Sequence, residues 1–320
     1  FINNISVLHY HEYNFEEHIK LAIYESLGGV IEEDIYDNIY EEIIEDIYIE
    51  KNIIKRSYKN FNNEINENNE EHLTYLKQIP QPQQRTEEWY DFRKKHITGS
   101  NCWKIFGSEK TTNQLFYEKL KPDEDSYSKP NLNDNSPFNW GHKYEPLSIK
   151  LYEFYNDITV EEFGCIPHKS IPFLAASPDG IVTSKKMNGR MVEIKNVVSR
   201  EITQIPKMEY YIQMQIQMEV CDLSSCDFIE TKFIEYNNEE DFRKDKYKLE
   251  KGMIIVLVED NSKLIFEYSP LFHNKESELN QFTEEVYKKY NFPDNILEYN
   301  NIKWFKNIYW KLDTFSNVYV

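Results

Sequence analysis

The first part of the chain has a helical spacing of apolar side chains. Isoleucine recurs at every fourth position with acidic residues between: Ile31, Ile35, Ile39 and Ile43. This period places the side chains on one face of a helix, so we expect helices within residues 5–58. Residues 60–71 are polar and rich in Asn and Glu, which is typical of a linker. We therefore expect an acidic helical region at 1–75, acting as a solvated appendage, a docking surface or a cover over an active site.

A new pattern begins after the prolines at positions 80 and 82. Thr86, followed by acidic residues at 87, 88 and 91, predicts a capped helix that runs through Arg93. Further helices are expected at 100–106, 112–120 and 144–155, and a loop at 123–137. The predicted apolar face of the helix at 144–155 holds three residues: Leu147, Leu151 and Phe154.

After residue 170 the apolar period changes to two, which predicts β-strands. Strands are expected at 171–176, 179–184, 190–197, 227–235, 253–258 and 263–268, with Asn188-Gly189 as a hairpin turn. Helices at 210–221 and 277–290 and an aromatic tail at 302–319 complete the pattern. This order of elements predicts an α/β or α+β fold with a mixed central sheet flanked by helices.

The charge of the chain is strongly acidic but unevenly distributed. Its 320 residues carry a net charge of −18, which at first argues against a nucleic-acid partner. Residues 1–79 hold 17 acidic and 6 basic side chains, so −11 lies there and −7 on the rest. Clustered carboxylates are also what a divalent metal needs, and net charge does not fix the chemistry of one cleft. A nucleic-acid partner is therefore not excluded.

Two other features narrow the classes of protein to consider. The longest clean apolar run, 253–258, is far shorter than the roughly 20 residues that a bilayer requires. We therefore expect no membrane partner, and the first residues do not predict a secretory signal. The cysteines are scattered and form no C-x-x-C pair: Cys102, Cys165, Cys221 and Cys226. They predict free thiols in an intracellular, reducing compartment, such as host cytoplasm or a viral replication site, rather than a zinc or iron–sulfur centre.

Two short motifs suggest a chemical site. On a strand, Glu193 and Lys195 share one face, whereas Val192 and Ile194 point to the core on the other. A partly solvated strand face would explain the charged pair, but burying it is costly unless it binds something. Asp179, within Ser-Pro-Asp-Gly, is either a plain turn residue or a neighbour of this pair across the hairpin.

If the hairpin forms, Asp179, Glu193 and Lys195 converge at one edge of the sheet. Carboxylate oxygens there suit a hard cation, and the carbonyl oxygen of Ile194 is a natural further ligand. Glu145, near the start of its predicted helix, is either a first-turn residue favoured by the helix dipole or another metal-binding carboxylate.

The order of these motifs resembles the lambda-exonuclease/YqaJ viral recombinase family of PD-(D/E)xK nucleases. Five stretches match it in sequence: Glu88-Trp89 with Arg93 and Ile97-Thr98-Gly99-Ser100, then Gly141 to Glu145, Ala176 to Gly180, Glu193-Ile194-Lys195, and Tyr210 to Gln215. The resemblance implies a restriction-endonuclease-like core at 85–235, in a nuclease domain at 76–320 with a C-terminal extension at 236–320. The sequence departs from the family at Gly99, where Ala is usual, and at Asn196-Val197, where many members have a small residue and Pro.

The resemblance also implies a role for particular residues. One or two Mg²⁺ or Mn²⁺ ions would be held by four groups: Glu145, Asp179, Glu193 and the carbonyl of Ile194. The implied catalytic residues are Glu145, Asp179, Glu193, Lys195 and Gln213. Among them, Lys195 would position or activate water, and Gln213 would line the site. A DNA phosphate, at a 5′ end in exonuclease members, would be held by Arg93 and Ser100. No iron–sulfur cluster is expected.

The activity implied is a metal-dependent deoxyribonuclease, foremost an exonuclease acting 5′ to 3′ from duplex ends in viral-type recombination, repair or defence. A DNA endonuclease or a mixed activity on the same site is the close alternative, and a non-catalytic DNA-binding or docking protein is the alternative of another class. DNA, as duplex ends or single strands, is the expected partner. A single-strand annealing protein, a helicase and further copies of the chain are candidates for others.

The tail offers a further choice between two interpretations. Basic and aromatic residues interleave over 303–311. This pattern occurs on platforms that stack single-stranded bases, and it also occurs on packed terminal elements with exposed lysines.

Overall fold

The computed structural model describes residues 67–121, 136–246, 250–259, 264–271, 275–290 and 302–320. One compact unit spans Asn66–Tyr319. The helices expected within 5–58 and most of the loop expected at 123–137 lie outside the described residues. None of the helices in the described part of the chain has the length and apolar character needed to cross a bilayer.

Helices lie where the sequence predicts them, and the structure adds two that it does not predict, at 67–78 and 239–244. Their bounds are α3 Glu67–Gln78, α4 Glu87–Lys95, α5 Gly99–Cys102, the 3-10 helix η3 Trp103–Phe106, α6 Glu109–Leu120, α7 Pro137–Asn156, α8 Met208–Cys221, α9 Glu239–Lys244 and α10 Glu276–Lys289. The linker prediction is wrong for residues 67–71, which begin α3. Leu73 and Leu76 of this helix are buried, so tertiary packing outweighs its polar composition.

The strands form two sheets, and their bounds are β1 Ile97–Thr98, β2 Val160–Glu161, β3 Ile166–Pro167, β4 Leu174–Ala176, β5 Gly180–Val182, β6 Met191–Asn196, β7 Cys226–Glu235, β8 Lys251–Glu259, β9 Leu264–Tyr268 and β10 Ile302–Tyr319. The larger sheet has the order β2-β5-β6-β7-β10-β8-β9, and the smaller β1-β4-β3. Pairing is parallel for β6 with β7 and for β1 with β4, and antiparallel elsewhere. The predicted α/β class, with a mixed sheet flanked by helices, is therefore confirmed.

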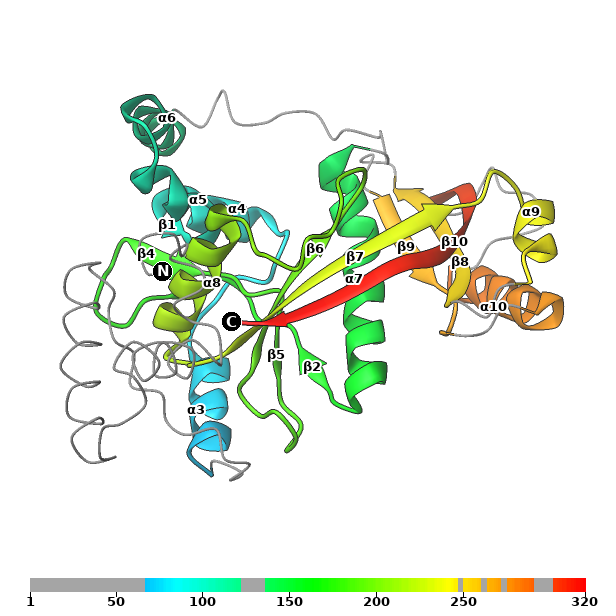
Figure 1. Ribbon diagram of the computed structural model, residues 1–320, viewed down its shortest axis with the longest axis horizontal. Coiled ribbons are helices and arrows are strands. Elements are labelled where there is room, and N and C mark those ends of the chain that lie inside the picture. Colours follow the sequence, from blue (N-terminus) through cyan, green and yellow to red (C-terminus); the bar gives the residue numbers. More distant parts are fainter. Residues whose placement is uncertain (1–66, 122–135, 247–249, 260–263, 272–274, 291–301) are drawn as a thin grey trace, which may run out of the picture. The chain divides into compact units, whose positions relative to one another are not determined.

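The predicted aromatic tail is a long inner strand. β10 pairs with β7 over one part of its length and with β8 over the other, and Figure 1 shows it running beside β7. Tyr309 and Trp310 are buried, which favours the packed terminal element over a surface platform. Strands β8, β9 and β10 thus extend the same sheet that holds β6.

Helix α7 covers one face of this sheet and is longer than predicted. Ser136 caps it by accepting a hydrogen bond from the backbone N–H of Asn139, and Pro137 occupies its first turn. Its buried face combines aromatic and aliphatic residues: Tyr144, Leu147, Leu151 and Tyr152. The prediction that Phe154 belongs to this face is wrong, because its side chain is 58% exposed.

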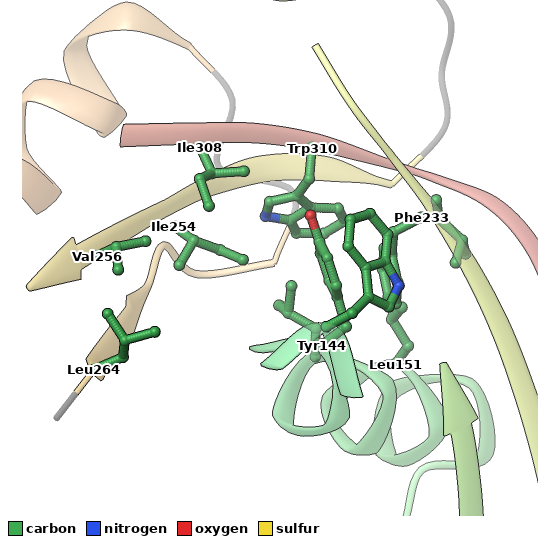
Figure 2. Packing of buried hydrophobic residues seen from close by; sticks show 11 residues of the cluster. Tyr144, Leu151, Phe233, Ile254, Val256, Leu264, Ile308 and Trp310 are labelled. Atoms are coloured by element: carbon green, nitrogen blue, oxygen red, sulfur yellow. The ribbon is translucent and has the colours of Figure 1, made fainter. Parts of the chain in front are cut away.

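The core lies on both faces of the sheet. Residues of α7 pack against alternate positions of β7, β8 and β10, including Phe233, Ile254 and Trp310 (Figure 2). On the other face, Phe242 of α9 and Phe282 of α10 pack against the remaining positions of β8. This double burial explains why β8 reads as a continuous apolar run rather than an alternating strand.

Candidate active site

The hairpin of β5 and β6 brings the two sequence motifs together. Gly189 has φ +81° in the turn, and the strands pair with Gly180 opposite Val192. Asp179 directly precedes β5, and its Oδ2 accepts a hydrogen bond of 2.7 Å from the backbone N–H of Ile194. The predicted closeness of Asp179 to the second motif is therefore present in the structure.

Alternation along β6 separates core residues from charged ones. Val192 and Ile194 pack against Tyr152 of α7. Glu193 lies on the opposite face with 0% of its side chain exposed, and Lys195 of the same face donates a hydrogen bond to its Oε1. A buried carboxylate needs such partners, because an unpaired charge in the interior is costly.

Helix α8 completes the surroundings of Glu193. Gln213 and Gln217 both donate side-chain hydrogen bonds to Glu193 Oε2, at 2.9 and 2.8 Å. Gln217 is only 1% exposed and is a site residue that the candidate set missed. The available signal was its spacing, since residues four apart in a helix share a face and Gln213 was already a candidate.

Glu145 reaches the site from α7, but not from the first turn of that helix, because α7 begins at Pro137. Its Oε1 accepts a hydrogen bond of 2.6 Å from Arg85, and the two side chains form an ion pair. Arg85 was also missed. Its approach to Glu145 depends on a turn conformation that residue type does not predict.

Electrostatics couple the three carboxylates. Burial raises the pKa of Asp179 well above its ordinary value, and the charges of Glu193 and Glu145 raise it further. Burial also raises the pKa of Glu145, against the opposing effect of Arg85. For Lys195, burial alone would lower the pKa, but the nearby carboxylates of Glu193 and Asp179 raise it above the ordinary value. Lys195 is therefore an ammonium group at neutral pH.

The donor set fits a hard divalent cation. Carboxylate and carbonyl oxygens are the ligands that Mg²⁺ prefers, and mutual repulsion between Asp179, Glu145 and Glu193 means that added positive charge would be favourable. Within the described ranges, no three His, Cys, Asp or Glu side chains converge closely enough to coordinate one ion as they stand.

Arg93 and Ser100 are brought together as predicted. Arg93 donates a hydrogen bond of 2.7 Å to Ser100 Oγ, and its guanidinium lies 4.2 Å from the ring centre of Trp89. The indole N–H of Trp89 in turn donates to Ser177 Oγ of the Ser-Pro-Asp-Gly turn, at 3.3 Å. Lys119 of α6 donates to the backbone carbonyl of Arg93 at 2.6 Å, so a second cation lies next to Arg93.

Part of the chain is similar to a known protein family. Residues 88–224 match the sequence model of the YqaJ-like viral recombinase domain. This part of the chain is therefore similar to the YqaJ-like family. The matched residues contain every predicted site residue, whereas the strands beyond β6 in the larger sheet lie outside them.

An uncharacterised protein of Acanthamoeba polyphaga mimivirus is 28% identical over 305 residues, which cover 84% of this chain and 52% of that protein. The chain therefore spans about half the length of the curated relative it matches.

Two solved structures are also similar to this chain. An alkaline exonuclease (LHK-Exo) from Laribacter hongkongensis is 22% identical with a TM-score of 0.39, covering 64% of this chain and 94% of that one. A phage-related exonuclease from Haemophilus somnus is 17% identical with a TM-score of 0.34, covering 60% and 90%.

Proposed function

We propose that this protein is a metal-dependent DNA nuclease, with Asp179, Glu193 and Lys195 at the centre of its active site. The observation that carries the proposal is their convergence inside a YqaJ-like domain, where Asp179 bonds the backbone of β6 and Lys195 pairs with Glu193. The intact acidic positions and Lys195 argue against a non-catalytic DNA-binding protein.

The metal would be Mg²⁺ or Mn²⁺, held by Glu145, Asp179, Glu193 and the carbonyl of Ile194. When bound, such an ion shields the charge of a phosphate and acidifies an attacking water. The site would hold one or two such ions.

The side chains of the domain would supply positioning and charge. The ammonium group of Lys195 would orient water and stabilise negative charge that develops on the phosphate. Gln213 and Gln217 fix the carboxylate of Glu193 from α8, so its orientation does not rely on Lys195 alone.

Arg93 and Ser100 would hold a phosphate of the DNA. A planar guanidinium already stacked on Trp89 loses little freedom when it forms two hydrogen bonds to phosphate oxygens. If this phosphate is at a 5′ terminus, the enzyme acts as an exonuclease from duplex ends in the 5′ to 3′ direction. This polarity rests on the family resemblance.

A cleavage assay tests the proposal. Linear duplex DNA labelled at each end and covalently closed circular DNA are incubated with Mg²⁺ or with EDTA. We expect loss of linear DNA with Mg²⁺ only, and at least about a hundredfold slower loss with Lys195→Ala. Lys244→Ala, which removes an exposed lysine of α9, is the matched control and should cleave like the wild type.

Each other outcome has a meaning. Cleavage of circular DNA at a similar rate would favour the endonuclease alternative on the same site. Equal cleavage by wild type and Lys195→Ala, or cleavage in EDTA, would contradict the proposed mechanism. Protection of ends that carry a 5′-hydroxyl in place of a 5′-phosphate would support the assigned role of Arg93.

A further inference from the structure

Arg85 lies at the active site in a conformation that its residue type disfavours. It is the third residue of the turn from Gln83 to Thr86, in which the backbone N–H of Thr86 bonds the carbonyl of Gln83 at 3.4 Å. Its φ is +65°, a value that glycine adopts freely and that a residue with a Cβ adopts only at a cost. Strain of this kind at a candidate site suggests that the side chain has a function there.

The turn is held in place from two sides. The side-chain amide of Gln84 donates to the carbonyls of Phe163 and Pro178, at 2.9 and 3.1 Å. The backbone N–H of Cys165 donates to Pro82 at 3.2 Å. The two backbone segments approach so closely here that a Cβ on Gly164 would lie 2.3 Å from the carbonyl oxygen of Pro82. The backbone of the turn that carries Arg85 is therefore held by contacts on both sides.

Arg85 points at one of the carboxylates that would bind metal. Its guanidinium pairs with Glu145 at 2.6 Å, and the two side chains are 32% and 21% exposed. The charge of Asp179 also acts on Arg85. A protein cation thus neutralises Glu145, as a bound divalent ion would.

We propose that Arg85 couples metal binding to DNA binding. Its guanidinium holds Glu145 through their ion pair. A divalent ion that takes Glu145 as a ligand displaces the guanidinium, which then binds a phosphate of the DNA strand in the site. The inference rests on the proposed function, because it uses the same carboxylates as metal ligands.

The metal half of the inference is tested without DNA or turnover. Mn²⁺ binding is measured by isothermal titration calorimetry on the full chain, for wild type and Arg85→Gly. Glycine suits the φ of +65°, so this variant removes the charge without adding backbone strain. We expect Arg85→Gly to bind Mn²⁺ about fivefold tighter, the scale of one partly exposed ion pair. Arg243→Ala, which removes a guanidinium of 30% exposure from α9, should leave the affinity unchanged.

The DNA half of the inference is tested in Ca²⁺, under conditions where this ion does not support cleavage. Binding to a duplex end is then measured by fluorescence anisotropy. Wild type should bind this DNA more tightly in Ca²⁺ than in EDTA. For Arg85→Gly, the increase in DNA affinity on adding Ca²⁺ should be about tenfold smaller than for the wild type, because one charge-assisted phosphate contact is missing. Unchanged or weaker Mn²⁺ binding by Arg85→Gly, or a full gain of DNA affinity in Ca²⁺, would overturn the inference.

Glu145→Gln separates this inference from the proposed function. If Mn²⁺ binds wild type, is lost in Glu145→Gln and is unaffected by Arg85→Gly, the metal site stands and only the coupling is wrong. If neither the wild type nor either variant binds Mn²⁺, the proposed function fails together with the inference.

Discussion

At the scale of single residues, Glu193 is the most completely enclosed charge of the candidate site. Three donors on two elements, Lys195, Gln213 and Gln217, satisfy its two oxygens. The alternation of a strand was enough to predict that Glu193 and Lys195 share a face. It did not predict that Arg85 contacts the site, because an arginine in the sequence does not indicate a backbone φ of +65°, a value typical of glycine.

Lys119 should make DNA affinity depend on pH. Burial lowers its pKa to about 8, and the nearby charge of Arg93 contributes. Lys119 is therefore a cation below this pH and becomes neutral above it, so an attraction to phosphate is present at pH 7 and lost as pH rises through 8. We expect the Kd for a duplex end in Ca²⁺ to rise about fivefold between pH 7 and 9.5 at constant ionic strength.

Two variants check the source of this dependence. Lys119→Arg keeps its charge throughout the range, so its Kd should stay nearly flat with pH. Lys119→Met should bind weakly at both ends of the range. A wild-type profile retained in Lys119→Met would assign the titration to another group.

At the scale of elements, local signals predicted helices and hairpins well and missed what distant contacts decide. Thr86 and its acidic neighbours predicted α4 correctly, and the cap observed on Thr86 is the reason. The start of α7 was missed because Ser136-Pro137 follows a polar stretch that reads as a loop. The pairing of β10 between β7 and β8 joins residues far apart in sequence, and periodicity carries no information on such partners.

Trp310 should be a major source of stability for the distal part of the sheet. It lies in the core between α7 and the strands β7, β8 and β10. Trp310→Ala should lower the free energy of unfolding by about 3–5 kcal/mol, because it leaves a large cavity. Equilibrium unfolding in urea measures this loss.

Trp310→Phe is the matched control for this substitution. The indole N–H of Trp310 is buried and makes no hydrogen bond within the described structure, so phenylalanine gives up little polar interaction. We expect it to cost less than about 1.5 kcal/mol. Equal losses for the two variants would mean that the ring volume is not what stabilises this core.

At the scale of the whole molecule, the charge of the chain is a poor guide to its site. A net charge of −18 suggests repulsion of DNA, yet Arg85, Arg93, Lys119 and Lys195 all lie around the candidate site. Residues 88–224 match the YqaJ-like domain, and the sheet continues beyond them through β7, β10, β8 and β9. The helical prediction for 5–58 remains a prediction, as does the domain division at residue 75.

The most direct test of the account is the position of a bound metal ion. Crystals soaked in Mn²⁺ are measured for anomalous scattering, with Asp179→Asn crystals treated identically. We expect a peak within coordination distance of Asp179, Glu193 and the carbonyl of Ile194 in the wild type, and none in the variant. A wild-type map with no peak there, or with its only strong peak elsewhere on the molecule, would contradict the assignment of these residues as the metal site.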